Sequence, residues 1–175
     1  MKEWKTLNAD AAKPAATAVE AKHVLLKTAE RGKAAVFFGE YNCTMDDKSR
    51  LSIPARFREE LGAEFIITRW LDGCIIVLPL DQLKRIEEIL AGKGLVKTRD
   101  IRRFLYSGLA KVTPDKLGRV LVPAPLRTHA GIEKDAVVIG VGSYAEIWEP
   151  DAWLRKQQED LADLPITETM EELDF

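Results

Sequence analysis

The sequence contains few cysteines and no long apolar run. Its two cysteines, Cys43 and Cys74, cannot form the kind of disulfide framework that holds small secreted domains together. Cys74 begins the apolar run 74–77, so a buried, reduced thiol is expected there. No segment approaches the roughly 20 apolar residues that a membrane-spanning helix needs. These absences favour a cytoplasmic protein that has no membrane partner.

Histidine is also scarce, and the sequence offers no catalytic constellation. His23 and His129 are its two histidines, and neither has a second ligand at the spacing of a metal site. The segment 140–143 is Gly-Val-Gly-Ser, but it lies between two expected strands, whereas a phosphate-binding loop joins a strand to a helix. No nucleophile has a recognisable base beside it. We therefore predict that the chain is not an enzyme and uses no metal, no cofactor and no small-molecule substrate.

An excess of basic residues is absent as well, since the formal net charge is -2. This value alone argues against nucleic acid as a partner. The charges are uneven, however: residues 37–153 hold seventeen bases and seventeen acids, whereas residues 154–175 hold two bases and seven acids. The acidic C-terminal segment therefore sets the sign, and the bases of the central part form clusters. These clusters contain Lys48, Arg50, Arg56 and Arg58; Arg99, Arg102 and Arg103; and Lys116, Arg119 and Arg127.

The feature that organises the sequence is one segment present in two copies. Residues 44–58 read TMDDKSRLSIPARFR, and residues 113–127 read TPDKLGRVLVPAPLR. The copies match at a constant offset of 69 positions, which pairs Asp46 with Asp115, Arg50 with Arg119, Pro54 with Pro123, Ala55 with Ala124 and Arg58 with Arg127. A repeat of this length is a duplicated domain and not the period of a solenoid.

Each copy predicts the same order of elements. Turn-prone residues follow the Asp, a short apolar run follows the Arg, and Pro-Ala then opens a helix, so the pattern indicates strand, tight turn, strand and helix. A second hairpin and another helix follow in both copies, with Asp81 and Asp151 as expected helix caps. Because one isolated hairpin is only marginally stable in water, each copy should pack against the other. The sequence therefore predicts a mixed α+β, β-rich fold whose two units form an intramolecular pseudo-dimer with short flanking helices.

The chain divides into five expected segments. Residues 1–36 form a flexible N-terminal extension that lacks the apolar core of a signal peptide. The remaining segments are a first unit at 40–85, a helical linker at 86–109, a second unit at 110–153, and a C-terminal helix with an acidic tail at 154–175. Because GTG, a bacterial start codon, also encodes valine, we further expect that residues 1–35 are an artefact of start-codon assignment.

The spacing Asp-x-x-x-Arg across a tight turn has a structural and a functional interpretation. Asp46 can accept backbone N–H groups of the turn and hold Arg50 in a fixed pose, and Asp115 and Arg119 can do the same. In the structural interpretation both pairs only fasten hairpins, which is the commoner role of such pairs. In the functional interpretation each turn contacts DNA, because a two-stranded ribbon fits the major groove and Arg can bond guanine in a bidentate way.

The functional interpretation assigns DNA contact to the basic side chains at the tips and flanks of both turns. They are Lys48, Arg50, Arg56, Arg58, Lys116 and Arg119. A solvated helix face is an equally good interpretation of Arg56 and Arg58. The arginines at 99–103 are more typical of an exposed face or a subunit contact.

Four segments of the sequence resemble the bacterial MraZ family. They are FGEY at 38–41, DDKSRLSIPARFR at 46–58, DKLGRVLVP at 115–123 and AEIWEPDAW at 145–153. The resemblance covers about residues 37–155. It implies two AbrB-like swapped-hairpin units, a ring-like homo-oligomer, and a transcriptional regulator that is cytoplasmic and nucleoid-associated. It also implies that the regulator binds double-stranded DNA at promoter repeats of the division and cell-wall gene cluster that contains its own gene, with Arg50 and Lys48 at the DNA.

The two copies differ in ways that bear on these expectations. Ser49 stands where the family usually has glycine, whereas Gly118 keeps that glycine in the second copy. The first turn is therefore expected either to be strained at a positive φ or to use a different turn type. Lys48 is replaced by Leu117 in the second copy, so the first copy is the expected DNA reader and the second chiefly completes the core. The alternative function is a scaffold or antitoxin-like interaction module on the same fold.

Overall fold

The computed structural model describes residues 35–162, with side chains for 35–160. The predicted N-terminal extension, up to residue 34, and the acidic tail, from residue 163, lie outside the described residues. Among the described residues, no helix is long and apolar enough to cross a membrane.

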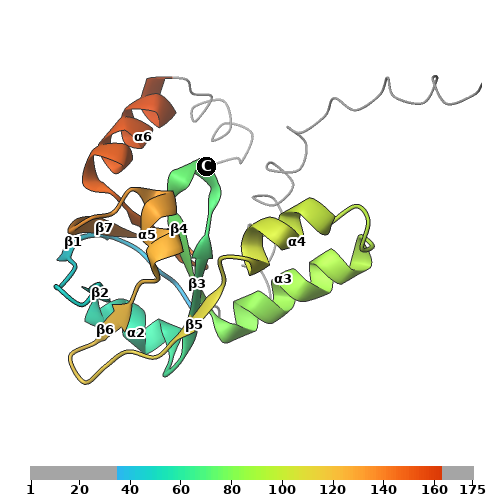
Figure 1. Cartoon of the computed structure of the whole chain (residues 1–175), viewed down its shortest axis with the longest axis horizontal. Coiled ribbons are helices and arrows are strands. Elements are labelled where there is room, and N and C mark those ends of the chain that lie inside the picture. The colour runs from blue at the N-terminus through green and yellow to red at the C-terminus, as the bar shows by residue number, and fades with distance from the viewer. Residues whose placement is uncertain (1–34, 163–175) are drawn as a thin grey trace, which may run out of the picture.

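The two copies fold into the same order of elements (Figure 1). The first copy contains β1 (Glu40–Thr44), β2 (Arg50–Ser52), α2 (Ala55–Leu61), β3 (Phe65–Arg69), β4 (Ile75–Pro79) and α3 (Leu80–Gly92), with a short 3-10 turn (η1, Leu71–Gly73) between β3 and β4. The second contains β5 (Ala110–Val112), β6 (Arg119–Leu121), α5 (Ala124–Ala130), β7 (Asp135–Gly140), β8 (Ala145–Trp148) and α6 (Pro150–Ala162). The helix α4 (Arg99–Tyr106) lies between the copies. The predicted mixed α+β class is confirmed.

Strands of one copy pair with strands of the other. The six-stranded antiparallel sheet has the order β1-β7-β8-β4-β3-β5, and β2 and β6 form a separate two-stranded ribbon. The pairs β1·β7, β3·β5, β4·β8 and β2·β6 each join the two copies. Neither copy could therefore keep all of its strand hydrogen bonds without the other.

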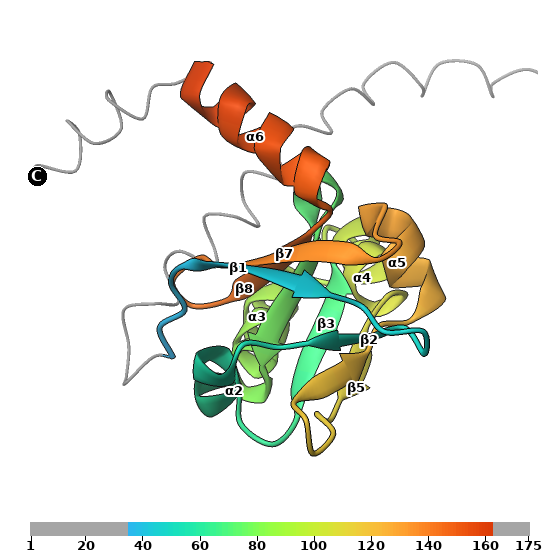
Figure 2. The same ribbon diagram turned by 90° about the vertical axis from the view of Figure 1, so that its left-hand side faces the viewer.

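The first hairpin of each copy does not form a ladder of its own. In the first copy, β1 and β2 meet only at the Met45–Leu51 bridge among the described residues, because β1 joins the large sheet while β2 turns away to pair with β6 (Figure 2). The second hairpins, β3·β4 and β7·β8, form as predicted. The predicted strand, turn and strand are thus present, but the two strands pair with the other copy and not with each other.

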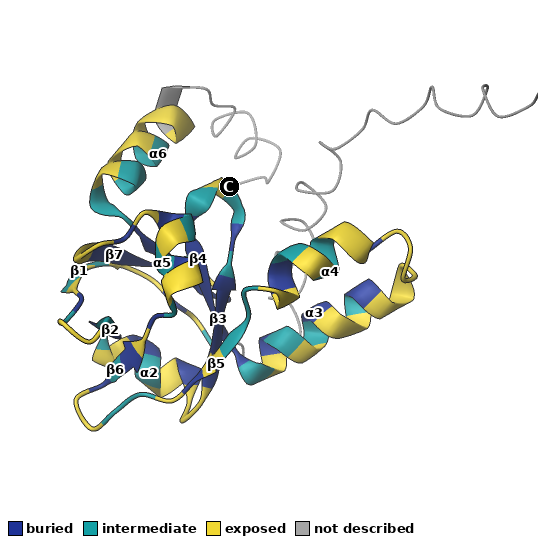
Figure 3. Cartoon of the chain, viewed as in Figure 1, coloured by how far each residue is buried: buried dark blue, intermediate teal, exposed yellow. Residues whose placement is uncertain are grey.

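Both faces of the large sheet are covered. On one face, Phe65 and Ile67 pack with the ribbon residues Leu51 and Val120 and with α2 and α5. On the other face, Ile66 packs under α3, α4 and the start of α6. The central strands are therefore apolar at successive positions, as expected for strands buried on two sides, and Figure 3 shows them as continuous buried segments. The ribbon lies on the opposite side of the molecule from the α3–α4 pair (Figures 1 and 2).

The helix ends differ from the prediction in their capping residues. No side chain caps α3, which begins after Pro79, so the cap predicted at Asp81 is wrong. At α6 the Glu149 carboxylate accepts the backbone N–H groups of Asp151 and Ala152 at 3.1 and 2.7 Å, so Glu149 fills the role predicted for Asp151. A glutamate one residue before the helix satisfies the same free N–H groups as a shorter capping residue.

Cys43 and Cys74 do not form a disulfide bond. Cys74 is fully buried, as predicted, and burial raises the pKa of the half-buried Cys43 thiol.

Candidate nucleic-acid interface

Each Asp-x-x-x-Arg turn is closed by its own aspartate. In the first turn, Asp46 Oδ1 accepts the backbone N–H groups of Lys48 and Arg50 at 3.0 and 2.9 Å. In the second, Asp115 Oδ1 accepts those of Leu117 and Arg119 at 2.9 and 3.0 Å. The short polar side chain thus replaces a backbone acceptor, which is why aspartate suits this position.

The two turns are joined by reciprocal ion pairs. Asp46 Oδ2 lies 2.8 Å from both Nε and Nη2 of Arg50, and it also accepts from Arg119 Nη1 at 3.2 Å. Asp115 Oδ2 in turn binds Arg119 at 2.9 and 2.8 Å and accepts from Arg50 Nη1 at 3.3 Å. Each arginine therefore holds the carboxylate of its own turn and that of the other copy. We call these four residues the reciprocal cluster.

The backbone repeats this exchange. The Ile53 N–H donates to the Gly118 carbonyl at 3.0 Å, and the Val122 N–H donates to the Ser49 carbonyl at 2.9 Å. Each turn thus supplies an acceptor to the strand end of the other copy. The two turns and the ribbon form one unit, which has approximate two-fold symmetry.

The pKa values of both aspartates are lowered by this arrangement. The side-chain hydrogen bond from Arg119, helped by the Arg119 backbone N–H, lowers the pKa of Asp115 to about 2. The same groups of Arg50 lower the pKa of Asp46. Hydrogen bonds to the charged form of a carboxyl favour ionisation, so both aspartates are ionised at neutral pH.

The third residue after each aspartate adopts a left-handed backbone. The φ of Ser49 is +59° and that of Gly118 is +77°. Of the two outcomes expected for Ser49, the structure has the strained one, because a residue with a Cβ atom is disfavoured at this φ. The two turns are therefore alike in conformation although they differ in sequence at this position.

Gly118 also lies in close contact with a side chain of the first copy. A Cβ atom built at Gly118 would lie 2.5 Å from Cζ of Arg58, so the Arg58 guanidinium occupies the place of a side chain. Arg58 Nε donates to the Ile53 carbonyl at 3.1 Å, and Arg127 Nε donates to the Val122 carbonyl at 3.3 Å in the matching position of the second copy. Both arginines are half-buried and help to hold the strand ends.

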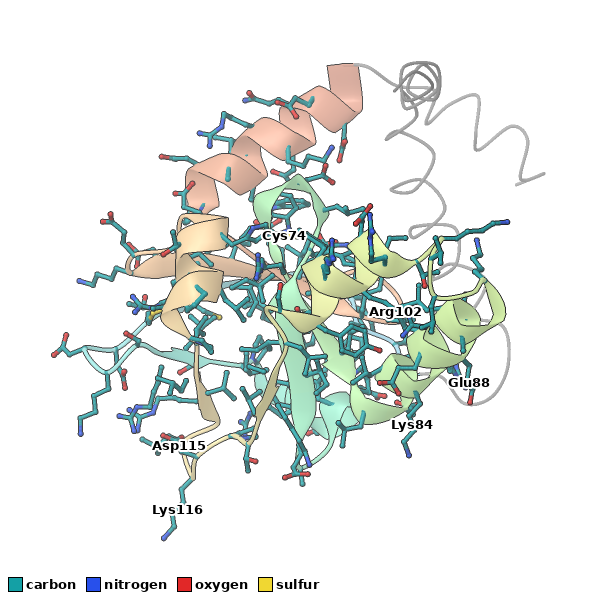
Figure 4. All side chains as sticks on the ribbon, turned by 45° about the vertical axis from the view of Figure 1, so that its right-hand side comes forward. Cys74, Lys84, Glu88, Arg102, Asp115 and Lys116 are labelled. Atoms are coloured by element: carbon teal, nitrogen blue, oxygen red, sulfur yellow. The ribbon has the colours of Figure 1, made fainter. Side chains whose placement is uncertain are left out.

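The remaining predicted contact residues are exposed. Lys48 and Lys116 are exposed at the tips of the two turns, and Figure 4 shows Lys116 pointing away from the body of the protein beside Asp115. Arg56 is exposed at the start of α2, with its guanidinium 3.5 Å from the ring centroid of the half-exposed Phe38. This cation–π contact orients Arg56 without burying its charge.

Arg50 and Arg119 are partly exposed, with 30% and 25% of their side-chain surfaces accessible. They lie on the outer face of the β2–β6 ribbon, because the alternate residues Leu51 and Val120 point into the core. The structure thus brings four of the six predicted contact residues, Lys48, Arg50, Lys116 and Arg119, to the ribbon and its two turns, and Arg56 and Arg58 lie on the adjoining helix α2.

The other basic group lies on α4. Arg99 and Arg103 are exposed and both pair with Asp100, at 3.4 and 3.7 Å, while Arg102 Nε donates to Thr98 Oγ1 at 3.0 Å. The helix α4 lies on the side of the molecule opposite the ribbon (Figure 1). Its arginines do not join the candidate interface.

Sequence reasoning missed the links between the copies. Asp46 and Arg119 are 73 positions apart, and only the equal spacing of the two motifs could have suggested that their charges meet. The contact of Arg56 with Phe38 had no signal in the sequence.

These features define a class: a duplicated α+β protein whose copies are joined through a charged β-ribbon, with no cluster of metal-binding side chains among the described residues. Comparison with known proteins gives the family. A family model for MraZ protein, which is described as antitoxin-like, matches residues 36–100 and 105–174. The chain belongs to the MraZ family.

Its relatives are named as transcriptional regulators. The chain is 47% identical over 120 residues to the transcriptional regulator MraZ of Heliobacterium modesticaldum, covering 67% of this chain and 84% of that protein. It is 44% identical over 140 residues to the protein of the same name from Clostridium acetobutylicum, covering 79% of this chain and 99% of that protein. The predictions of this family and of a non-enzymatic protein are thereby confirmed.

Proposed function

We propose that the chain is a sequence-specific, DNA-binding transcriptional regulator, and that the β2–β6 ribbon with its two turns faces the DNA. The observation that carries this proposal is the reciprocal cluster on the outer face of the ribbon, flanked by the exposed Lys48 and Lys116. A two-stranded ribbon is narrow enough for the major groove of DNA. The names of the relatives support the regulatory role.

The reciprocal cluster suits base recognition because it holds both arginine side chains in place before DNA binds. A guanidinium has five N–H donors, and the Arg50 contacts with Asp46 and Asp115 use three of them, which leaves two for DNA. The same count holds for Arg119. A guanidinium that is already ordered loses less entropy when it binds guanine. The structural and functional interpretations of the motif are thus compatible, since holding the turn also aims the arginine.

The other basic residues have graded roles in this proposal. Lys48 and Arg56 bind phosphates, because an exposed charge on a long side chain contacts the backbone of any sequence. Lys116 makes a weaker phosphate contact, because the first copy is the main DNA reader. Arg58 contributes less directly, since its guanidinium lies over Gly118. The first copy contributes more charge than the second.

The proposal extends to the fold family and the assembly. The exchange of strands between the copies supports two AbrB-like swapped-hairpin units, at 40–85 and 110–153, with a helical linker at 86–109 between them and a C-terminal helix and tail at 154–175.

We place the chain in the cytoplasm at the nucleoid, as a ring-like homo-oligomer that binds promoter repeats of the division and cell-wall gene cluster containing its own gene. An oligomer needs few phosphate contacts per chain, because linked sites bind at high effective concentration, so a near-neutral net charge is compatible with this role.

Titration of labelled DNA tests the function. The DNA upstream of the gene for this chain and a random duplex of equal length are titrated at several salt concentrations. We expect tighter binding to the upstream DNA at each salt concentration, and affinity that falls as salt rises. Varying the number of tandem repeats in the DNA tests the ring. Equal affinity for both duplexes at every salt concentration would contradict the proposal.

Arg50→Lys tests the direct contact, because lysine keeps the charge but not the bidentate fork. We expect this variant to lose preference for the upstream DNA while it keeps binding to random DNA. If the preference is unchanged, Arg50 only fastens the turn.

The description of the family as antitoxin-like favours one second candidate, a module that binds another protein through the same ribbon. That candidate predicts no DNA preference at any salt concentration.

A further inference from the structure

The outer face of the ribbon carries one apolar side chain, Leu121, and we infer that Leu121 reads the 5-methyl group of thymine next to the base pair contacted by Arg50. This inference rests on the proposed function and deepens it, since it names a feature of the DNA sequence that the ribbon recognises.

The register of the ribbon places Leu121 beside Arg50. The two residues are direct cross-strand partners in the antiparallel pair of β2 and β6, and directly opposed residues point to the same face with Cβ atoms about 5 Å apart. Leu121 is 58% exposed, whereas its neighbours Val120 and Val122 are each 1% exposed. Leu121 therefore belongs to the charged outer face and not to the core.

The first copy shows that the fold does not require leucine there. The position that matches Leu121 is Ser52, which is also exposed and pairs directly with Arg119. The outer face of the ribbon thus has two cross-strand pairs, Arg50 with Leu121 and Arg119 with Ser52. A polar residue fits the same site in the same ribbon, so the leucine has no structural requirement within the described residues.

Thymine is the partner whose chemistry fits an exposed leucine next to a guanidinium. In the major groove, guanine offers two acceptors to arginine, while thymine presents its methyl group as the apolar feature that side chains can contact. Phosphate and sugar give an aliphatic side chain no comparable partner. The pair Arg50 and Leu121 therefore matches a guanine and a thymine at neighbouring positions.

The test replaces thymine by deoxyuridine, which removes the methyl group and keeps the base pairing. The full-length protein is titrated with the DNA upstream of its own gene, in a thymine form and a fully deoxyuridine form. We expect the deoxyuridine form to bind about fourfold more weakly for each thymine methyl group that Leu121 would otherwise cover, the factor that corresponds to burying one methylene-sized group. Leu121→Ser should bind both forms equally.

Two further variants make the result specific. Leu117→Ser removes the other exposed leucine of the second turn, which is 69% exposed at its tip, and it should keep the wild-type ratio between the two DNA forms. Ser52→Leu should raise that ratio, because it places a leucine beside Arg119.

The outcomes separate this inference from the function on which it rests. If neither DNA form is preferred over random duplex, the proposed function fails. If the upstream DNA is preferred but the wild type binds both forms equally, or Leu121→Ser keeps the wild-type ratio, the thymine contact is wrong. A change in the oligomer size of Leu121→Ser would also overturn it, because Leu121 would then lie between copies of the chain.

Discussion

The two Asp-x-x-x-Arg turns are nearly identical inside and different outside. Their aspartates make the same backbone hydrogen bonds, and their arginines make the same pair of bridges within and between copies. On the surface, Lys48 at the first turn faces solvent where Leu117 does at the second, and Ser52 corresponds to Leu121. Both copies thus keep the aspartates and arginines that join them, and the exposed residues around the turns differ in charge and polarity.

Within the two turns, the contact of Arg58 with Gly118 is where we expect a small substitution to cost the most stability. Gly118→Ala should lower the free energy of unfolding by about 2 kcal/mol, because it adds the cost of a Cβ at positive φ and forces the Arg58 guanidinium away from the Ile53 carbonyl. Chemical denaturation measures this value.

Gly131→Ala is the matched control, since Gly131 also has a positive φ but no atom within 4 Å of a built Cβ. It should cost about 1 kcal/mol. Equal costs for the two variants would mean that Arg58 moves away freely and does not help to join the turns.

Acid should break the reciprocal cluster, because protonated aspartates no longer form the ion pairs that join the two turns. The folded-state pKa values of Asp46 and Asp115 are lowered, to about 2 for Asp115. A carboxyl with a lowered pKa stabilises the fold at pH values above its ordinary pKa, and this contribution is lost as pH falls toward the folded-state value. Stability should therefore decline between about pH 4 and about pH 2.

Asp46→Asn and Asp115→Asn should each remove part of this decline and lower the thermal midpoint at neutral pH by similar amounts. The double variant should lose less than the sum of the two, because both aspartates belong to one network. Thermal unfolding followed across the pH range gives both results. Additive losses would mean that the two turns are independent.

The smallest expected effect comes from Ser49, where the turns differ in backbone strain. Ser49→Gly should raise the free energy of unfolding by about 0.5 kcal/mol, because relief of the positive φ exceeds the entropy that glycine adds to the unfolded chain. The DNA affinity should stay the same, since the turn conformation is already left-handed. If Ser49→Gly lowers the free energy of unfolding, a contact of the Ser49 side chain stabilises the fold by more than the positive φ destabilises it.

The sequence was sufficient to predict the repeat, the turns and the second hairpins, because those depend on local signals. Pro54 and Pro123 precede helices, and Ser49 takes the positive φ that its position in the turn requires. The family was recognisable from the same motifs.

Pairing between the copies could not be predicted from local signals. A strand, a turn and a strand look alike whether the strands pair with each other or with another copy, and β2 pairs with β6, far along the sequence. Which pairing forms depends on where the apolar faces of the strands can be buried. Leu51 and Val120 point into a core that both copies build, so the exchange follows from packing and not from turn residues.

The candidate site was predicted as a set of residues but not as a geometry. Lys48 and Lys116 are exposed as expected, whereas the link of Arg50 to Asp115 appears only in three dimensions. Leu121 was not predicted as part of the site, although strand alternation places it on the same face as Arg119 and the repeat aligns it with the polar Ser52.

The central claim is that the two turns are one structural unit with unequal roles at DNA. Its most direct test is the slope of log affinity against log salt for the upstream DNA, measured for wild type, Lys48→Ala and Lys116→Ala. Removing one phosphate contact should reduce the slope by about one. We predict that reduction for Lys48→Ala and a clearly smaller one for Lys116→Ala. An unchanged slope for Lys48→Ala, or a larger change for Lys116→Ala, would contradict the claim.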